Sequence, residues 1–110
     1  MERFIKGDVV VIPFPFTNLT ETKKRPAFVV TNLQGNDIII CPITSQLNKD
    51  NYSILITSSD MKTGELNKIS NARPNVIFTA DRNLIKYKIG KLTQTKTTEI
   101  INKIIEIIKS

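Results

Sequence analysis

Cationic and hydroxyl side chains flank two neighbouring apolar runs of the sequence. Lys24 and Arg25 stand before the first run, and Thr44 and Ser45 follow the second. Residues 34–37 between the runs (Gln-Gly-Asn-Asp) are typical of a tight turn, so the runs are predicted to pair as antiparallel strands. The start of one strand then lies beside the end of the other, which makes Arg25 and Thr44 neighbours.

An arginine beside a threonine can act on a phosphate. The guanidinium presents a planar fork of donors to phosphate oxygens and the hydroxyl adds one more, so the pair can stabilise a pentacoordinate phosphorane. An ordinary solvated arginine at a strand start, followed later by a Thr-Ser turn or helix cap, accounts for the same residues. Spacing alone favours this second interpretation.

The overall charge supports a polyanionic partner. The 110 residues contain 16 Lys and Arg against 10 Asp and Glu, a formal charge of +6. Each phosphate neutralised by such a surface releases counterions, so nucleic acid is the first partner to consider. A coding bias toward Ile, Lys and Asn would produce the same balance. The length is that of one domain, which we assign to residues 1–110.

Several chemistries are excluded by composition. The chain has no histidine, which removes Ser-His-Asp and Cys-His catalysis and His-bearing zinc sites. Its one cysteine, Cys41, cannot form an internal disulfide or a thiolate metal cage, and its apolar surroundings predict a buried thiol. We expect no cofactor and no metal site built on imidazole or thiolate ligands. No apolar run is long enough to span a membrane and no signal peptide is recognised, so a cytoplasmic protein is expected.

The hydrophobic pattern predicts a small barrel or sandwich of short strands. The apolar stretch of residues 9–12 is expected to end at Pro13, and residues 17–24 read as an exposed polar loop. Arg73 before Pro74 repeats the Arg-Pro strand entry of Arg25. Further strands are predicted at residues 25–31, 37–43, 52–57, 66–70, 73–80 and, in short pieces, 84–92, with a loop at 58–64.

The end of the chain changes to a helical period. Isoleucines at positions 100, 101, 104, 105, 107 and 108 form an amphipathic stripe. Thr95 or Thr97 is expected to cap this helix, with Glu99 in its first turn. We expect the helix to pack on the barrel, because isoleucine is a modest helix former and tertiary contacts must hold it.

A basic stretch surrounds one tyrosine near the end of the strand region. Its pattern fits a phosphate-tracking face with a stacking ring, although a solvated strand edge that resists aggregation is a commoner origin. The residues are Lys86, Tyr87, Lys88 and Lys91.

The motifs together resemble a known family. The motifs follow one another along the chain in this order: Gly7-Asp8-Val9-Val10, residues 13–17 (PFPFT), residues 24–30 (KRPAFVV), Ile43-Thr44-Ser45, and the run from Arg73-Pro74 through residues 78–81 (FTAD) to residues 89–92 (IGKL). They resemble the MazF/PemK-type toxins of bacterial toxin-antitoxin systems. The resemblance covers nearly the whole chain.

The resemblance implies an SH3-like β-barrel with a C-terminal α-helix, a homodimer, and a metal-independent endoribonuclease that cuts single-stranded RNA at short sequence motifs. Arg25 resembles the catalytic arginine of the family and Thr44 its catalytic threonine. The implied RNA-binding or auxiliary residues are Lys24, Ser45, Arg73, Asn75 and Thr17. In this family an acidic antitoxin folds against the toxin and blocks its RNA groove, and the loop at residues 17–24 is the expected gate.

Two departures from the family pattern bear on the chemistry. Some members carry an aspartate where Asn75 stands, and some use a histidine in the first loop, so no general base is evident in this chain. In the implied reaction the ribose 2′-hydroxyl attacks phosphorus, leaving a 2′,3′-cyclic phosphate and a 5′-hydroxyl. A non-catalytic SH3-like toxin that acts on a protein target such as gyrase, and an RNA-binding member that no longer cleaves, remain alternatives.

Overall fold

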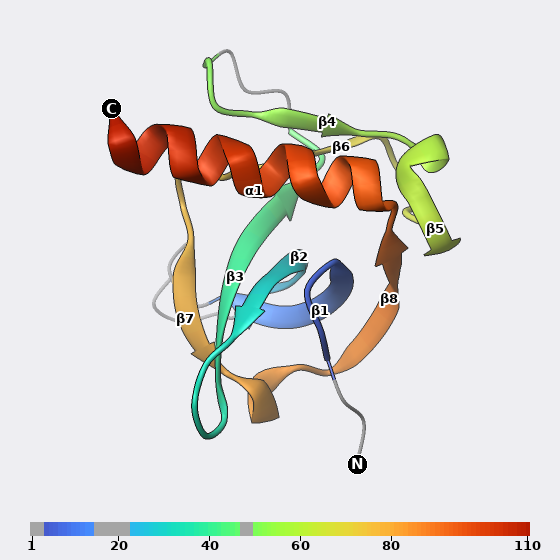
Figure 1. Cartoon of the computed structure of the whole chain (residues 1–110). Helices are drawn as coiled ribbons and strands as arrows, with labels where there is room; N and C mark the ends of the chain where they lie inside the picture. The colour runs from blue at the N-terminus through green and yellow to red at the C-terminus, as the bar shows by residue number, and fades with distance from the viewer. Residues whose placement is uncertain (1–3, 15–22, 47–49) are drawn as a thin grey trace.

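The computed structural model describes residues 4–14, 23–46 and 50–110. Within these ranges the chain is mainly β, with eight strands and one C-terminal α-helix (Figure 1). The strands are β1 (Asp8–Phe14), β2 (Lys23–Asn32), β3 (Asp37–Thr44), β4 (Ile54–Ile56), β5 (Met61–Gly64), β6 (Ser70–Ala72), β7 (Phe78–Asp81) and β8 (Tyr87–Leu92). Short 3-10 turns cover Ser58–Asp60 and Arg82–Leu84, and α1 covers Gln94–Lys109.

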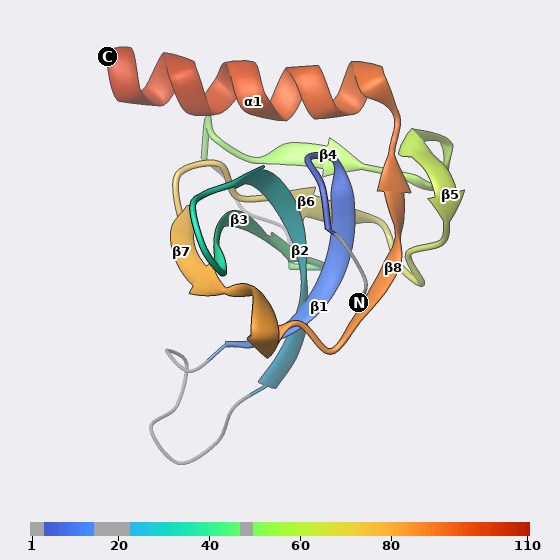
Figure 2. The same ribbon diagram turned by 60° about the horizontal axis from the view of Figure 1, so that its bottom comes forward.

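The strands form one curled antiparallel sheet in the order β4-β6-β3-β2-β1-β8-β5, and β7 joins it by pairing with β3. The first half of β3 pairs with β7 over Asp37 to Ile40, whereas its end pairs with β6 through Ile43 and Thr44. Because β3 has two different partners along its length, the sheet bends there into a small barrel (Figure 2). The expected mainly β barrel with a C-terminal helix is confirmed.

Strand β1 runs through Pro13, where the sequence predicted its end. Its pairing with β8 stops at Val11, so the last residues of β1 have only β2 beside them. A proline is tolerated there because a strand edge leaves its missing N–H without consequence. The extension is important for the site, because it lets β2 begin at Lys23 and places Lys23 and Lys24 in a strand instead of the predicted loop.

The β2–β3 hairpin forms as predicted. Gly35 takes a positive φ of 67° at its turn, and the backbone N–H of Leu33 donates to the carbonyl of Asp37 at 2.9 Å. Glycine adopts this conformation without strain whereas most other residues do not, which explains the strength of the turn signal. The hairpin brings the start of β2 beside the end of β3.

The second half of the chain departs more from prediction. Strand β4 is only three residues long, the expected loop at 58–64 contains β5, and β6 begins where the predicted strand at 66–70 ends. The predicted strand entry at Arg73 is wrong, because the carbonyl of Arg73 accepts from Val76 N at 3.0 Å and closes a turn before β7. These strands are short and pair with partners that are distant in the sequence. Local sequence patterns therefore predict their bounds poorly.

Apolar side chains fill both faces of the curled sheet. On one face Val10, Ile12, Val29 and Ile40 belong to one buried cluster, and on the other Val9, Phe28, Cys41 and Ile43 belong to a second cluster that includes residues of the helix. The predicted burial of Cys41 is confirmed, with no exposed surface.

Helix α1 lies across one end of the barrel (Figure 2), as expected. Ile100 and Ile104 are buried against the sheet. The helix begins earlier than predicted: Thr93 is its N-cap and accepts from Lys96 N at 3.2 Å, so Glu99 lies outside the first turn. Within the described ranges, no helix combines the length and apolar character that crossing a bilayer requires.

Candidate active site

A surface cavity of about 600 Å³ opens where β2 begins and β3 ends. Its walls also include the segment between β5 and β6 and the first residues of β8. The volume falls in the range of roughly 300–1,000 Å³ that is usual for ligand sites. Together with Val11 of β1, five segments of the chain therefore contribute to one concave surface.

Arg25 and Thr44 both line this cavity, which confirms their predicted proximity. Ala27 pairs with Pro42 across β2 and β3, so Arg25, two residues back along β2, stands at the level of Thr44, two residues on along β3. On its other side Arg25 pairs with Ile12 of β1. The backbone of Arg25 is thus held by its pairing with β1, next to the point where the pairing of β2 with β3 ends.

The guanidinium of Arg25 has a hydrogen-bond donor that no acceptor in the described part of the chain satisfies. Its Nε atom is buried and makes no hydrogen bond to the described part of the chain. A buried donor without an acceptor is costly, and a phosphate oxygen would satisfy it with a charge-assisted hydrogen bond. Arg25 is therefore arranged to receive an anion.

The hydroxyl of Thr44 is oriented by the turn that follows it. Its Oγ1 accepts a hydrogen bond from Gln46 N at 3.2 Å, and the carbonyl of Gln46 accepts from Asn71 Nδ2 at 3.0 Å. Since the oxygen is already an acceptor, its own proton is available to donate into the cavity. Ser45, between the two, also lines the cavity.

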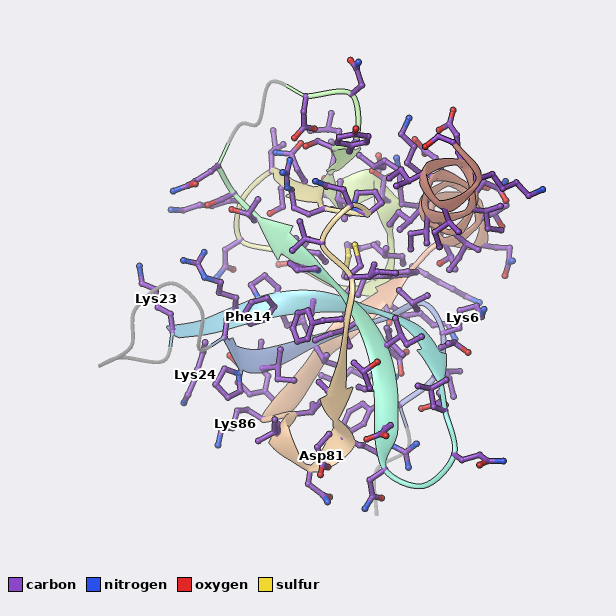
Figure 3. The ribbon with its side chains drawn as sticks, turned by 90° about the vertical axis from the view of Figure 1, so that its left-hand side faces the viewer. Lys6, Phe14, Lys23, Lys24, Asp81 and Lys86 are labelled. Carbon is purple, nitrogen blue, oxygen red and sulfur yellow. The ribbon has the colours of Figure 1, made fainter. Side chains whose placement is uncertain are left out.

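Cations dominate the charged residues of the cavity wall: Lys23, Lys24, Arg25 and Lys68 against a single carboxylate, Glu65. Figure 3 shows Lys23 and Lys24 at the end of the sheet that also carries Lys86. Such an excess of positive charge attracts polyanions and orients phosphates.

Glu65 and Lys68 were not singled out from the sequence, because they belong to a segment that was expected to be an ordinary loop and strand. Their type alone carries no signal, since charged residues are usual on any surface.

One member of the basic stretch reaches the cavity. Tyr87 lines it and is 55% exposed, with its pairing partner Val11 on the adjacent strand. Lys88 instead reaches the fully buried carboxylate of Asp8, with Nζ and Oδ1 3.2 Å apart. Within this stretch, the ring of Tyr87 therefore lines the cavity, whereas Lys88 forms a structural ion pair.

Arg73 does not line the cavity. Its guanidinium Nη1 lies 2.7 Å from Asp50 Oδ2 and donates to Ser53 Oγ at 2.7 Å. Arg73 holds the pKa of the Asp50 carboxyl at about 2, below its ordinary value of 3.8. Asn75 is exposed in the turn that follows Arg73, and Thr17 lies outside the described residues.

The described residues contain no group of three or more His, Cys, Asp or Glu side chains that could hold a metal ion. The donors that line the cavity are mostly cationic or hydroxyl groups, which suit an anion.

A family model for the PemK-like, MazF-like toxins of type II toxin-antitoxin systems matches residues 5–108. The chain belongs to this family. The match includes every strand, most of α1 and all residues of the cavity wall, so the family extends over the whole candidate site of this MazF-like toxin. No curated protein matches the sequence significantly.

Solved structures of the family share the fold. A MazE-MazF complex from Deinococcus radiodurans superposes with a TM-score of 0.77 at 15% identity, covering 96% of each chain. MazF from the same organism gives 0.76 at 15% identity and full coverage of both chains. A mycobacterial endoribonuclease in complex with its cognate antitoxin gives 0.73 at 16% identity, covering 97% of this chain and 96% of that one. At such identities the comparison establishes the MazF-like fold.

Proposed function

We propose that this toxin is a metal-independent, sequence-specific endoribonuclease that cleaves single-stranded RNA. The observation that carries the proposal is the pairing of Arg25, with its buried and unpartnered Nε, and Thr44 in one cationic cavity. Membership of the MazF-like family supports the same activity, and a structural neighbour is described as an endoribonuclease.

In the proposed reaction the ribose 2′ oxygen attacks the adjacent phosphorus and the bond to the 5′ oxygen breaks. The products are a 2′,3′-cyclic phosphate and a 5′-hydroxyl. Arg25 neutralises the charge that develops on the phosphorane oxygens, and the Thr44 hydroxyl donates a further hydrogen bond. Arginine is a poor proton acceptor because it stays protonated, so Arg25 acts electrostatically.

The remaining cavity residues hold the substrate. Lys23, Lys24 and Lys68 attract the backbone, and Ser45 adds a hydroxyl beside the scissile phosphate. The exposed ring of Tyr87 offers a stacking surface for an unpaired base. DNA binds to the same charges, but it lacks the 2′-hydroxyl nucleophile.

Arg73 is assigned a supporting role. Its ion pair with Asp50 ties the segment after β6 to the residues just before β4. RNA binding through Arg73 requires this pair to open, with Asn75 exposed beside it. Thr17 is proposed to contact RNA on the strength of the family resemblance.

We assign the toxin an acidic antitoxin as partner and a homodimeric state in the cytoplasm. Antitoxins accompany MazF-like neighbours in complexes from Deinococcus radiodurans and a mycobacterial species. The excess of positive charge favours an acidic partner. Exposed apolar side chains at Leu55 of β4 and at Ile105 and Ile108 of α1 support a contact with a second copy.

Incubation of the purified protein with long single-stranded RNA in excess chelator tests the proposal. Discrete cuts with 5′-hydroxyl and cyclic phosphate ends are expected, and Arg25→Ala or Thr44→Ala should slow cleavage by about 10²-fold or more. Arg82→Ala is the matched control, because Arg82 bonds to Asn32 and lies outside the cavity wall. Full activity in both site variants would overturn the assignment.

The same experiment separates the alternatives. RNA that is retained on the protein but never cut would mark a binding member of the family. Neither binding nor cleavage would point to a protein target such as gyrase.

A further inference from the structure

We infer that Glu65 is the proton acceptor for the 2′-hydroxyl, an inference that rests on the proposed ribonuclease activity. Attack by the 2′ oxygen needs a group that accepts its proton, placed within reach of the ribose. The chain has no histidine, so this group must be of another kind.

The cavity wall offers one candidate. Its other polar side chains are Lys, Arg, Thr, Ser, Asn and Tyr, and Glu65 is the sole carboxylate among the described lining residues. Ammonium and guanidinium groups offer no lone pair that could accept a proton, and hydroxyl and amide groups are very weak bases. Glu65 alone combines basicity with a place in the cavity.

The backbone fixes Glu65 beside the cavity. Gly64, the residue before it, pairs with Gly90 of β8, and the strands approach so closely that a Cβ on Gly64 would lie 2.7 Å from the Gly90 Cα. Leu66, the residue after it, packs against the core. Glu65 is therefore held between two anchored neighbours and next to Ile89, which also lines the cavity.

The carboxylate of Glu65 is also free. In the described part of the chain it forms no ion pair or hydrogen bond, and Asp37 at the β2–β3 turn is the other such acidic residue. The remaining described carboxylates are engaged by Lys88, Arg73, Lys96, Lys103 or a backbone amide. An engaged carboxylate stabilises structure, whereas an unengaged one at a cationic cavity is available for chemistry.

The step balances without a metal or a co-reactant. The 2′ oxygen forms its bond to phosphorus as its proton passes to Glu65. The phosphorus bond to the 5′ oxygen breaks with the electron pair on oxygen, which takes a proton from solvent water. The resulting hydroxide recovers the proton from Glu65, and the carboxylate is restored.

The test compares Glu65→Gln with wild type and with Asp37→Asn. Glu65→Gln keeps the size of the side chain and removes the proton acceptor, so kcat/KM on a cleavable RNA should fall by about 10²–10⁴-fold. Binding of the same RNA with a 2′-deoxy sugar at the cleavage position should not weaken. The fall in cleavage rate at acidic pH, which reflects protonation of the base, should disappear in Glu65→Gln. Asp37→Asn should behave as wild type.

The outcomes distinguish this inference from the proposed function. If wild type cuts no RNA, the proposed ribonuclease activity fails. If wild type cuts and Glu65→Gln cuts at the same rate with the same pH profile, Glu65 is not the base, although the activity stands. Weakened binding of the 2′-deoxy RNA with an unchanged rate at saturation would assign Glu65 to substrate positioning and overturn its role as base.

Discussion

Gly64 and Gly90 face each other across β5 and β8 at a distance that admits no side chain on either residue. A Cβ on Gly90 would lie 2.9 Å from the Gly64 Cα and overlap the carbonyl oxygen of Thr63. Gly64 also has a positive φ of 73°, which L residues rarely adopt. This contact sets the position of the segment that carries Glu65.

Gly90→Ala should therefore destabilise the protein and displace the cavity wall. The loss from strain is expected to be at least about 1–3 kcal/mol in the free energy of unfolding, measured by urea denaturation. Gly35→Asn is the control, because a Cβ on Gly35 would meet nothing within 4 Å and asparagine tolerates its positive φ. Equal stability of Gly90→Ala and wild type would show that β5 can move away at no cost.

The Asp50–Arg73 ion pair should make the free energy of unfolding depend on pH in the acidic range. The pKa of Asp50 is lowered to about 2 in the folded protein, so the pair contributes stability above the ordinary value of 3.8 and loses it as pH falls from there to about 2. Urea midpoints measured through this range should fall less steeply in Asp50→Asn than in wild type. An unchanged slope would mean that other carboxylates govern the acid transition.

The Cys41 thiol should resist alkylation in the folded protein. Burial raises its pKa to about 12, which keeps the thiol protonated and unreactive at neutral pH. Since it is the one cysteine of the chain, labelling by iodoacetamide should follow global unfolding and accelerate in urea. Rapid labelling in native buffer, before any loss of circular dichroism signal, would contradict this.

Docking of α1 should depend on its buried isoleucines. Ile100 is fully buried beside Val9, Phe28 and Leu92, so Ile100→Ala should lower the free energy of unfolding by about 2–5 kcal/mol. Ile108 is 70% exposed on the same helix, and Ile108→Ala provides the control. Urea denaturation of both variants makes the comparison. Similar losses at the two positions would mean that burial of Ile100 against the sheet adds no stability beyond that of an exposed isoleucine.

The cavity lysines should determine the salt dependence of RNA binding. Removing one phosphate contact with Lys24→Gln or Lys68→Gln should reduce the slope of log K against log salt by about 0.7 for single-stranded RNA. Uncleavable 2′-deoxy RNA keeps binding separate from catalysis. Lys103→Gln is the control, because Lys103 pairs with Glu106 on α1. The assignment of both lysines to the RNA surface is wrong if their slopes match that of the control.

The first half of the fold follows from local patterns in the sequence. Short stretches of sequence are enough to predict four elements: the valine-rich β1, the Gly35 turn, the β2–β3 pair and the helix α1 with its isoleucine stripe. The proximity of Arg25 and Thr44 in the cavity wall follows from that hairpin. Strand β5 was missed, β6 was misplaced, and β4 and β7 are shorter than predicted, because these strands are short and are stabilised by partners far along the chain.

The sequence by itself determined the family, the basic charge, the absence of imidazole chemistry and the neighbourhood of Arg25 and Thr44. Only the tertiary structure decided which other charges join them. It brought Glu65 and Lys68 into the cavity wall and engaged Arg73 with Asp50 outside it. The physical reason is that Glu65 follows the β5–β8 glycine contact and Arg73 meets Asp50 from 23 residues away in the sequence, and local patterns do not reveal such long-range contacts.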